Sequence, residues 1–253
     1  MASRESELPR ELLCDESITS EETRAIVREA WRAVAGLVTV TLIEGKALGV
    51  IATCDIAAGQ LLLQEWPLLQ LRPDGAGRYD GMYDGERERA RALLSTLSSA
   101  KPGAGDLGGV IETNGIVVNH GQPGAFTVVN LMISRCNHSC APNAVFVWDA
   151  VLELGRLDAK RPIPAGTEVT INYGAHGGRM RRQRILSQRF NFMCECELCC
   201  LSGEALKRND ALEEEHYSRE SAVSSDEEDA ELEASGVDPH HTTCNDIKHS
   251  RLC

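Results

Sequence analysis

Three cysteines near residue 195 have a spacing that suits a metal ion. Cys194, Cys196 and Cys199 form C-x-C-x-x-C, which lets three thiolates converge on one ion, whereas tetrahedral zinc takes four ligands. Cys200 directly follows Cys199 and is a poor fourth ligand for geometric reasons. Cys140 or a histidine is the better candidate. The alternative is a group of thiols that bind no metal, and a metal site is favoured over it.

Two polar segments precede these cysteines. The first is Asn137-His138-Ser139-Cys140-Ala141-Pro142-Asn143, and the second is Ile171-Asn172-Tyr173-Gly174. Taken alone, the first indicates a turn whose Asn side chains satisfy backbone groups. The second alone indicates a strand that ends in a Tyr packed on the core. The occurrence of both segments before the cysteine motif, in this order, favours a functional interpretation of all three.

The elements that must position these segments are short strands. Runs rich in β-branched or aliphatic residues, separated by turn residues, predict strands at 37–43, 48–53, 61–71, 144–148, 151–157 and 168–173. A capping box that starts at Thr19 predicts a helix ending near Gly36. A second helix is expected at Glu86–Ser99, with Leu93, Leu94 and Leu97 inward. Many strands and few helices indicate a β-rich α+β fold.

The net charge and the cysteine content restrict the partners and the cellular compartment that we expect. The chain has 253 residues, 42% of them hydrophobic, and a net charge of -12. This charge disfavours direct binding to nucleic acid, which needs a surplus of Lys and Arg, and suits basic protein partners. Ten cysteines without a recognisable signal peptide indicate a reducing compartment, where clustered cysteines more often bind metal than form disulfides. No stretch of the sequence is long and apolar enough to predict a membrane span.

The three segments together resemble the SET-domain protein-lysine methyltransferases, most closely the SET-and-MYND branch, although no MYND zinc finger is present. The basic run from Arg181 to Leu186 is similar to that branch. A weaker likeness extends from Ala47 through Gly59 to Pro67. The resemblance covers roughly residues 37–73 and 110–200. It implies a SET fold of short twisted sheets with knot-like C-terminal threading and a zinc-bound post-SET segment.

The resemblance also implies roles for particular residues. Tyr173 matches the catalytic tyrosine, and Phe190 stands in the substrate channel where the family often has Tyr. Ala47 replaces the first Gly of the family's G-x-G motif. The implied zinc ligands are Cys140, Cys194, Cys196 and Cys199, and the implied S-adenosylmethionine-binding residues are Leu48, Gly49, Asn114, Ser134, Asn137, His138 and Phe192.

The predicted organisation has four parts. They are an N-terminal extension with one helix (1–36), a SET domain with an insertion at about 72–110 (37–193), a post-SET zinc segment (194–203) and an acidic, disordered tail (204–253). The expected protein is monomeric, acts in the nucleus or cytoplasm, and methylates a lysine in a basic protein segment such as a histone tail. The alternatives are a SET-like interaction module without activity and a redox or zinc-only protein.

Overall fold

A computed structural model describes residues 36–72, 90–100, 107–122 and 124–221. They form two compact units. Of the described residues, the first unit comprises those up to His138 together with Pro142–Ile171, and the second comprises Ser139–Ala141 and those from Asn172 to residue 221. The predicted N-terminal helix falls outside the described residues. Within the described ranges, no helix combines the length and apolar character that crossing a membrane requires.

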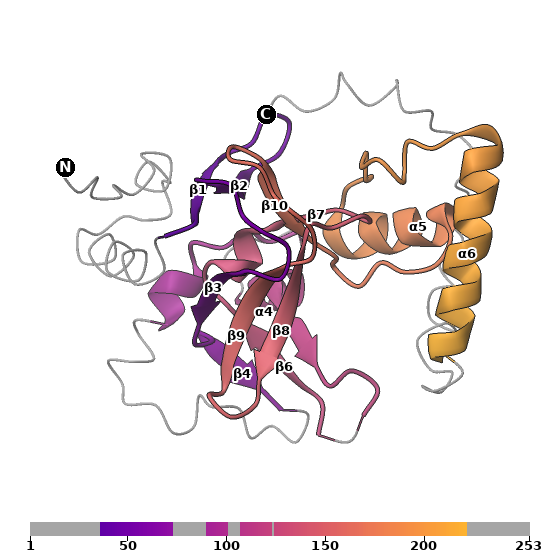
Figure 1. Ribbon diagram of the computed structural model, residues 1–253. Coiled ribbons are helices and arrows are strands. Elements are labelled where there is room, and N and C mark those ends of the chain that lie inside the picture. Colours follow the sequence, from indigo (N-terminus) through magenta and orange to yellow (C-terminus); the bar gives the residue numbers. More distant parts are fainter. Residues whose placement is uncertain (1–35, 73–89, 101–106, 123, 222–253) are drawn as a thin grey trace. The chain divides into compact units, whose positions relative to one another are not determined.

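Small sheets form most of the first unit, as the sequence predicts (Figure 1). The sheets have the strand orders β1-β2-β10-β7, β3-β9-β8 and β4-β6-β5. Neighbouring strands are antiparallel except β10 and β7, which run parallel. The strands are β1 (Val38–Leu42), β2 (Leu48–Ala52), β3 (Leu61–Glu65), β4 (Leu69–Leu71), β5 (Ile116–Val118), β6 (Phe126–Val129), β7 (Asn137–His138), β8 (Ala144–Asp149), β9 (Leu154–Ala159) and β10 (Glu168–Ile171).

Most predicted strands are found, but β9 begins at Leu154 rather than at residue 151, and β10 ends at Ile171, so Tyr173 lies after the strand rather than at its end. Two further differences are informative. The expected strand over 61–71 is divided into β3 and β4, because Pro67 between them has no N–H to give to a ladder. The short strands β5, β6 and β7 were not predicted. β7 has only two residues, so its sequence carries no strand periodicity and only its pairing with β10 defines it.

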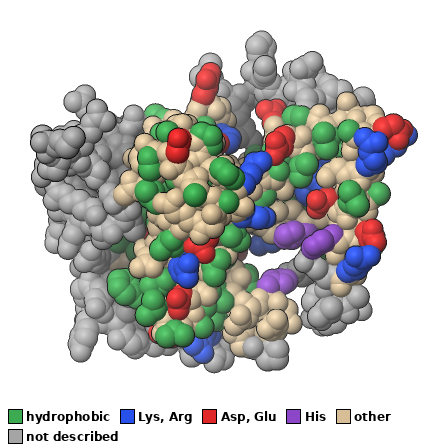
Figure 2. Space-filling model, in the orientation of Figure 1, with side chains coloured by type: hydrophobic (Ala, Val, Ile, Leu, Met, Phe, Trp, Pro, Cys, Tyr) green, Lys and Arg blue, Asp and Glu red, His purple; other side chains and the backbone are tan. Residues whose placement is uncertain are grey.

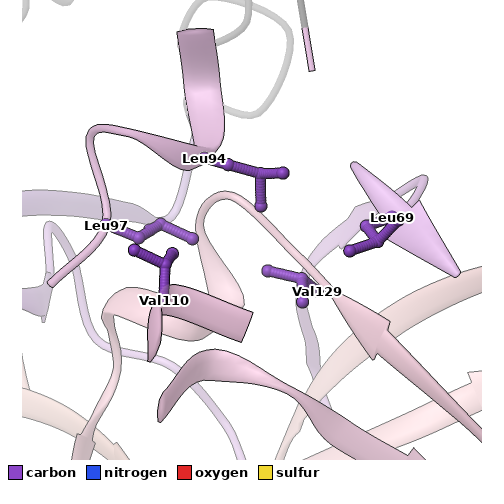
Figure 3. Close-up of a cluster of buried hydrophobic side chains, with 5 residues drawn as sticks. All are labelled: Leu69, Leu94, Leu97, Val110 and Val129. Carbon is purple, nitrogen blue, oxygen red and sulfur yellow. The ribbon is translucent and has the colours of Figure 1, made fainter. Parts of the chain in front are cut away.

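The insertion contributes helical segments to a buried cluster that it shares with strands β4 and β6. Residues 90–94 are helical, whereas residues 95–99 of the predicted helix form a turn and irregular backbone, so the prediction is right for only half of its described part; residues 86–89 fall outside the description. Helix α4 (Leu107–Asn114) follows. Side chains from both helical segments pack with strands β4 and β6 in one buried cluster (Figure 3), made of Leu69, Leu94, Leu97, Val110 and Val129.

Helix α5 (Arg179–Phe190) is the centre of the second unit. It buries Arg182, Ile185 and Leu186, which lie on one face because they are three and four residues apart. The helix ends at Asn191, which adopts a left-handed conformation with φ of 57° and donates its backbone N–H to the Ser187 carbonyl.

Helix α6 (Gly203–Ser221) corrects the prediction that the tail is disordered from residue 204. Figure 1 shows it crossing one end of α5. Asp210 Oδ1 accepts the N–H of Arg179 at 2.8 Å and Glu214 Oε1 accepts that of Gly178 at 2.8 Å, so two carboxylates satisfy the open N–H groups where α5 begins. Disorder was predicted because the segment lacks periodic apolar residues, whereas charged side chains make its contact with α5. Residues 222–253 lie outside the described residues.

The surface of α6 is charged with both signs (Figure 2). Lys207 pairs with Glu204 three residues away, and Arg219 pairs with Glu215 four residues away. Such exposed pairs contribute only a few tenths of a kcal/mol each to a helix. The stacking of the Arg181 guanidinium over the Tyr217 ring, 4.2 Å from its centroid, adds a further contact between α5 and α6.

Candidate functional site

Four cysteines of the second unit converge at one point. The Sγ atoms of Cys140, Cys194, Cys196 and Cys199 all lie within 4.8 Å of one another. Cys140 Sγ is 4.0 Å from Cys194 Sγ and 3.5 Å from Cys199 Sγ. Sulfurs around tetrahedral zinc stand about 3.8 Å apart, since each Zn–S bond is about 2.3 Å, whereas a disulfide needs about 2.05 Å. The four thiols therefore have the spacing of metal ligands, and the fourth member is Cys140 rather than a histidine.

The protonation of each of these thiols depends on that of the others, because their sulfur atoms are in contact. Hydrogen bonding to Cys194 and its neighbours raises the pKa of Cys140, whereas hydrogen bonding from Cys140 lowers the pKa of Cys196 to about 5. One thiolate can be stabilised by the protons of the other thiols. Removing all four protons from a partly buried group requires a cation to balance the charge, and a divalent ion with a preference for sulfur meets that requirement.

Helix α5 holds the cysteine segment through polar side chains. The Gln183 amide accepts the Cys194 N–H at 2.8 Å and donates to the Cys194 carbonyl at 2.7 Å. Arg179 Nη1 donates to the carbonyls of Cys199 and Leu201. Arg179 and Gln183 are four residues apart and so lie on the same side of the helix. Sequence analysis missed both, because polar helix residues are usually solvent-facing.

Tyr173 belongs to a tight loop between β10 and α5. The Asn172 Oδ1 accepts the N–H groups of Gly174 and Ala175 at 2.9 and 2.8 Å, and its Nδ2 donates to the Ala175 carbonyl. Gly174 has a φ of +85°, which few other residues adopt readily. Asn172 therefore fixes the backbone on which Tyr173 is carried. An Asn before Tyr-Gly is the turn signal that could have identified it.

Aromatic side chains gather around Tyr173. Its ring centroid is 4.8 Å from that of Phe190, with an angle of 48° between the ring planes. Tyr173, Phe190 and Phe192 pack against the same core of the second unit, whose buried members are Ala175, Ile185, Leu186, Cys194 and Cys199. The structure thus brings three residues of the predicted site together with the cysteine cluster.

The remaining residues of the predicted site lie in the first unit, where Asn137 contacts strand β2. Its Nδ2 donates to the Leu48 carbonyl at 3.3 Å and to Glu168 Oε1 at 2.8 Å. A Cβ on Gly49 would lie 2.7 Å from Asn137 Nδ2 and 2.5 Å from Ile43 Cγ1, so only glycine fits. Leu48, Gly49 and Asn137 therefore adjoin one another. Glu168, which also pairs with Lys46 at 2.6 Å, was not foreseen.

A second contact joins Ser134 and Asn114. Ser134 Oγ donates to the Asn114 carbonyl at 3.2 Å. The Asn114 side chain donates to the carbonyls of Ser98 and Val110, each at 2.7 Å, so its amide nitrogen is engaged in fixing the insertion. His138 is buried, 6% exposed, and its backbone pairs with Ile171 of β10.

The Asn143 side chain behaves as the simple turn interpretation predicts. Its Nδ2 donates to the Glu168 carbonyl and its Oδ1 accepts the Thr170 N–H, each at 2.8 Å. The amide therefore takes the place of a neighbouring strand on β10. The Asn143 hydrogen bonds and the pairing with β7 both hold strand β10, which ends shortly before Tyr173.

Glu65 supports the segment that carries Ser134 and Asn137. Its carboxylate accepts the N–H of Met132 at 2.9 Å and that of Ile133 at 2.8 Å, at the start of the 3-10 helix η2 (Ile133–Arg135). Burial raises the pKa of Glu65 to about 7, although these backbone N–H groups and Arg135 oppose the shift. η2 in turn contacts β2, so Glu65 fixes a segment that packs on the strand that contains Leu48 and Gly49.

Comparisons with known proteins place these geometries in context. A sequence model of the SET domain matches residues 47–174. The histone-lysine N-methyltransferase set5 of Schizosaccharomyces pombe is 27% identical over 170 residues, which are 67% of this chain and 52% of that protein.

Two other relatives match shorter segments. The histone-lysine N-methyltransferase ASHR1 of Arabidopsis thaliana is 35% identical over 74 residues, 29% of this chain and 15% of that protein. The protein-lysine N-trimethyltransferase SMYD5 of Danio rerio is 36% identical over 73 residues, 27% of this chain and 18% of that protein. The chain thus spans about half the length of the Schizosaccharomyces pombe relative and less of the other two.

Proposed function

Because the chain belongs to the SET domain family, we propose that it transfers a methyl group from S-adenosylmethionine to a lysine side chain of a protein. The relatives named above are lysine methyltransferases, one of them a SMYD protein, which confirms the resemblance drawn from the sequence. The observation that carries the proposal is the tyrosine loop that follows β10, packed in one unit with the four-cysteine cluster.

One zinc ion bound by Cys140, Cys194, Cys196 and Cys199 is part of the proposal. The donor set and the sulfur spacing both suit zinc. Cys140 comes from a segment more than fifty residues before the others, as the separations of 54 and 59 residues indicate. Zinc would therefore tie Ser139–Ala141 to the segment after α5 and stabilise the unit that carries Tyr173.

S-adenosylmethionine would be held by Leu48, Gly49, Asn114, Ser134, Asn137, His138 and Phe192. The contact of Asn137 with the Leu48 carbonyl and the lack of room for a Cβ at Gly49 support a backbone-lined site at β2, since polar backbone groups there can bind an amino-acid moiety. When bound, the cofactor supplies a methyl group on a positively charged sulfur. His138 and Ser134 would complete the polar wall, and Phe192 would pack on an apolar part of the cofactor.

The residues of the chain would position the lysine amine and select its neutral form. Neutralising a free lysine with a pKa of about 10.4 at pH 7 requires about 4–5 kcal/mol. A narrow apolar channel beside a positive charge lowers that requirement. Tyr173 and Phe190, with rings in contact, would form this channel. The Tyr173 hydroxyl would orient the amine for in-line attack, so that positioning supplies much of the rate.

The proposed substrate is a basic protein segment, such as a histone tail, and the protein would act in the nucleus or the cytoplasm. Two of the relatives are named histone-lysine N-methyltransferases. The net charge of -12 favours a basic partner. Glu195 and Glu197 are exposed between the cysteines, where they would attract Lys and Arg residues that flank the target lysine.

Calorimetric titration followed by product analysis tests the proposal. S-adenosylmethionine is expected to bind zinc-loaded protein in a ratio of one to one, and incubation with core histones is expected to add methyl groups to lysine, read by mass spectrometry. Binding without transfer to any peptide of a proteome-wide panel would favour the alternative, a SET-like interaction module. Absence of both binding and transfer would refute the proposal.

A further inference from the structure

Glu168 joins several polar groups of the first unit. It is the first residue of β10, where its backbone pairs with Ile51 of β2 and its carbonyl accepts the Asn143 Nδ2. Its carboxylate uses both oxygens, because Oε2 pairs with Lys46 Nζ at 2.6 Å and Oε1 accepts the Asn137 Nδ2 at 2.8 Å. The Glu168 side chain is 20% exposed, against 43% for Lys46, so the carboxylate is the better shielded partner of this ion pair.

The Asn137 side chain connects Glu168 to the proposed cofactor site. Its Nδ2 also donates to the Leu48 carbonyl at 3.3 Å. A Cβ on Gly49 would lie 2.7 Å from Asn137 Nδ2 and 3.2 Å from Glu168 Oε1. Asn137 and Glu168 therefore meet directly beside the backbone of Gly49.

The chemistry of its two neighbours fixes the orientation of the Asn137 amide. A backbone carbonyl and a carboxylate can only accept hydrogen bonds, whereas an amide has a donor end and an acceptor end. The Nδ2 group therefore points to Leu48 and Glu168 and uses its hydrogens there. The Oδ1 acceptor is left for a ligand, and Asn137 is only half-buried.

The amino-acid part of S-adenosylmethionine carries a group that suits this acceptor. Its positively charged amino group donates hydrogen bonds and accepts none. If the amide were reversed, Nδ2 would face that amino group and Oδ1 would face two acceptors. Polar groups left unpaired in this way weaken binding. The orientation of one amide thus decides whether the site favours a positively charged amino group.

We propose that Glu168 is a positioning residue for the cofactor, which holds the Asn137 amide so that its Oδ1 accepts from the amino group of S-adenosylmethionine. This inference rests on the proposed function. Glu168 acts through Asn137 and touches none of the reacting atoms. Lys46 is a neighbour of the carboxylate and not part of the site, since a partly exposed ion pair contributes little by itself.

Calorimetric affinity of zinc-loaded protein for S-adenosylmethionine at neutral pH tests the inference. Glu168→Gln keeps the shape of the side chain but gives it a donor end. The Lys46 ammonium attracts the oxygen of that Gln, so its NH2 group faces Asn137 Nδ2 and favours reversal of the Asn137 amide. We expect Glu168→Gln to bind the cofactor about 10- to 100-fold more weakly. The Tm of cofactor-free protein reports any loss of folding.

A second substitution should restore the affinity of this variant. In Glu168→Gln/Lys46→Met, no ammonium holds the Gln oxygen, which can again accept from Asn137 Nδ2. We expect this double variant and Lys46→Met alone to bind with near the wild-type affinity. The matched control is Glu168→Gln/Lys160→Met, which removes an exposed lysine of the same unit, outside the ion pair of Glu168. It should bind as weakly as Glu168→Gln.

Other outcomes overturn the inference separately from the proposed function. Wild-type protein that binds no S-adenosylmethionine refutes the proposed function itself. If the wild type binds but Glu168→Gln binds equally well, or if Lys46→Met restores nothing to it, Glu168 does not orient Asn137. If Lys46→Met tightens binding equally in wild type and in Glu168→Gln, or if Lys160→Met also restores affinity, net charge is the cause and the inference is wrong.

The double variant also decides the case in which Glu168→Gln is isolated only as unfolded protein. Folded Glu168→Gln/Lys46→Met with near-normal affinity then supports the orienting role. A tenfold or larger loss of affinity in the double variant, or its failure to fold, refutes that role.

Discussion

Replacing Glu65 by Gln changes how stability depends on pH. Burial raises the pKa of this carboxyl from 4.5 to about 7, so the folded state holds more protons than the unfolded state between these values. The stabilisation from the bound proton is complete below pH 4.5 and is lost as pH rises through 7. This direction is opposite to that of a carboxylate in a salt bridge. A shift of this size corresponds to roughly 3 kcal/mol.

The assay compares thermal unfolding of wild type and Glu65→Gln at about pH 5 and about pH 8. The glutamine resembles the protonated carboxyl at both values, so the stability of the variant relative to wild type should rise by up to about 3 kcal/mol between them, or roughly 6–12 °C in Tm for a domain of this size. Because the variant is compared with wild type at each pH, the contributions of titrating groups that both proteins share cancel. Parallel Tm profiles of the two proteins would show that Glu65 titrates normally and would refute the reasoning.

Further predictions concern three other features. Asp210→Ala and Glu214→Ala should each lower the free energy of unfolding by about 1 kcal/mol, because each removes an acceptor from the start of α5. Both variants are compared by urea unfolding with an otherwise unchanged chain that ends at residue 221. Unchanged unfolding midpoints would contradict the contact. Cys140→Ser should lose the zinc that elemental analysis finds in wild type, and Cys200→Ser should keep it; full zinc in Cys140→Ser would remove Cys140 from the ligand set. Phe190→Tyr should shift products toward fewer methyl groups, because a hydroxyl beside Tyr173 can hold the amine or a water; identical product distributions by mass spectrometry would leave Phe190 as a packing residue.

Sequence patterns predicted the features that depend on local residue types. The strands around Val40 and Val50 follow from β-branched runs, and the cysteine cluster follows from C-x-C-x-x-C spacing. The fourth cysteine is separated from the others by more than fifty residues, so spacing alone left Cys140 and histidine open. The family resemblance favoured Cys140, and the structure confirms that it joins the other three. The knot-like threading, the domain boundaries and the roles of the site residues remain predictions.

Features that depend on tertiary contacts were not predicted from the sequence. Strand β7 exists because β10 pairs with two residues of a turn-like segment. Helix α6 was missed because its contact with α5 is made by carboxylates such as Asp210, in a segment whose acidity indicates disorder. Gln183 was missed because polar residues are usually exposed, whereas here its side chain binds the backbone of Cys194.

Methyl transfer by Tyr173→Phe tests the proposed activity most directly. Wild type and variant, both zinc-loaded, are incubated with labelled S-adenosylmethionine and the same histone or peptide substrate, and label on lysine is counted. The variant keeps the ring that packs on Phe190, so Tm and cofactor affinity should stay nearly unchanged. The account predicts transfer lower by orders of magnitude, with a loss of 100-fold costing about 2.7 kcal/mol in transition-state stabilisation. Near-normal transfer by Tyr173→Phe would contradict it.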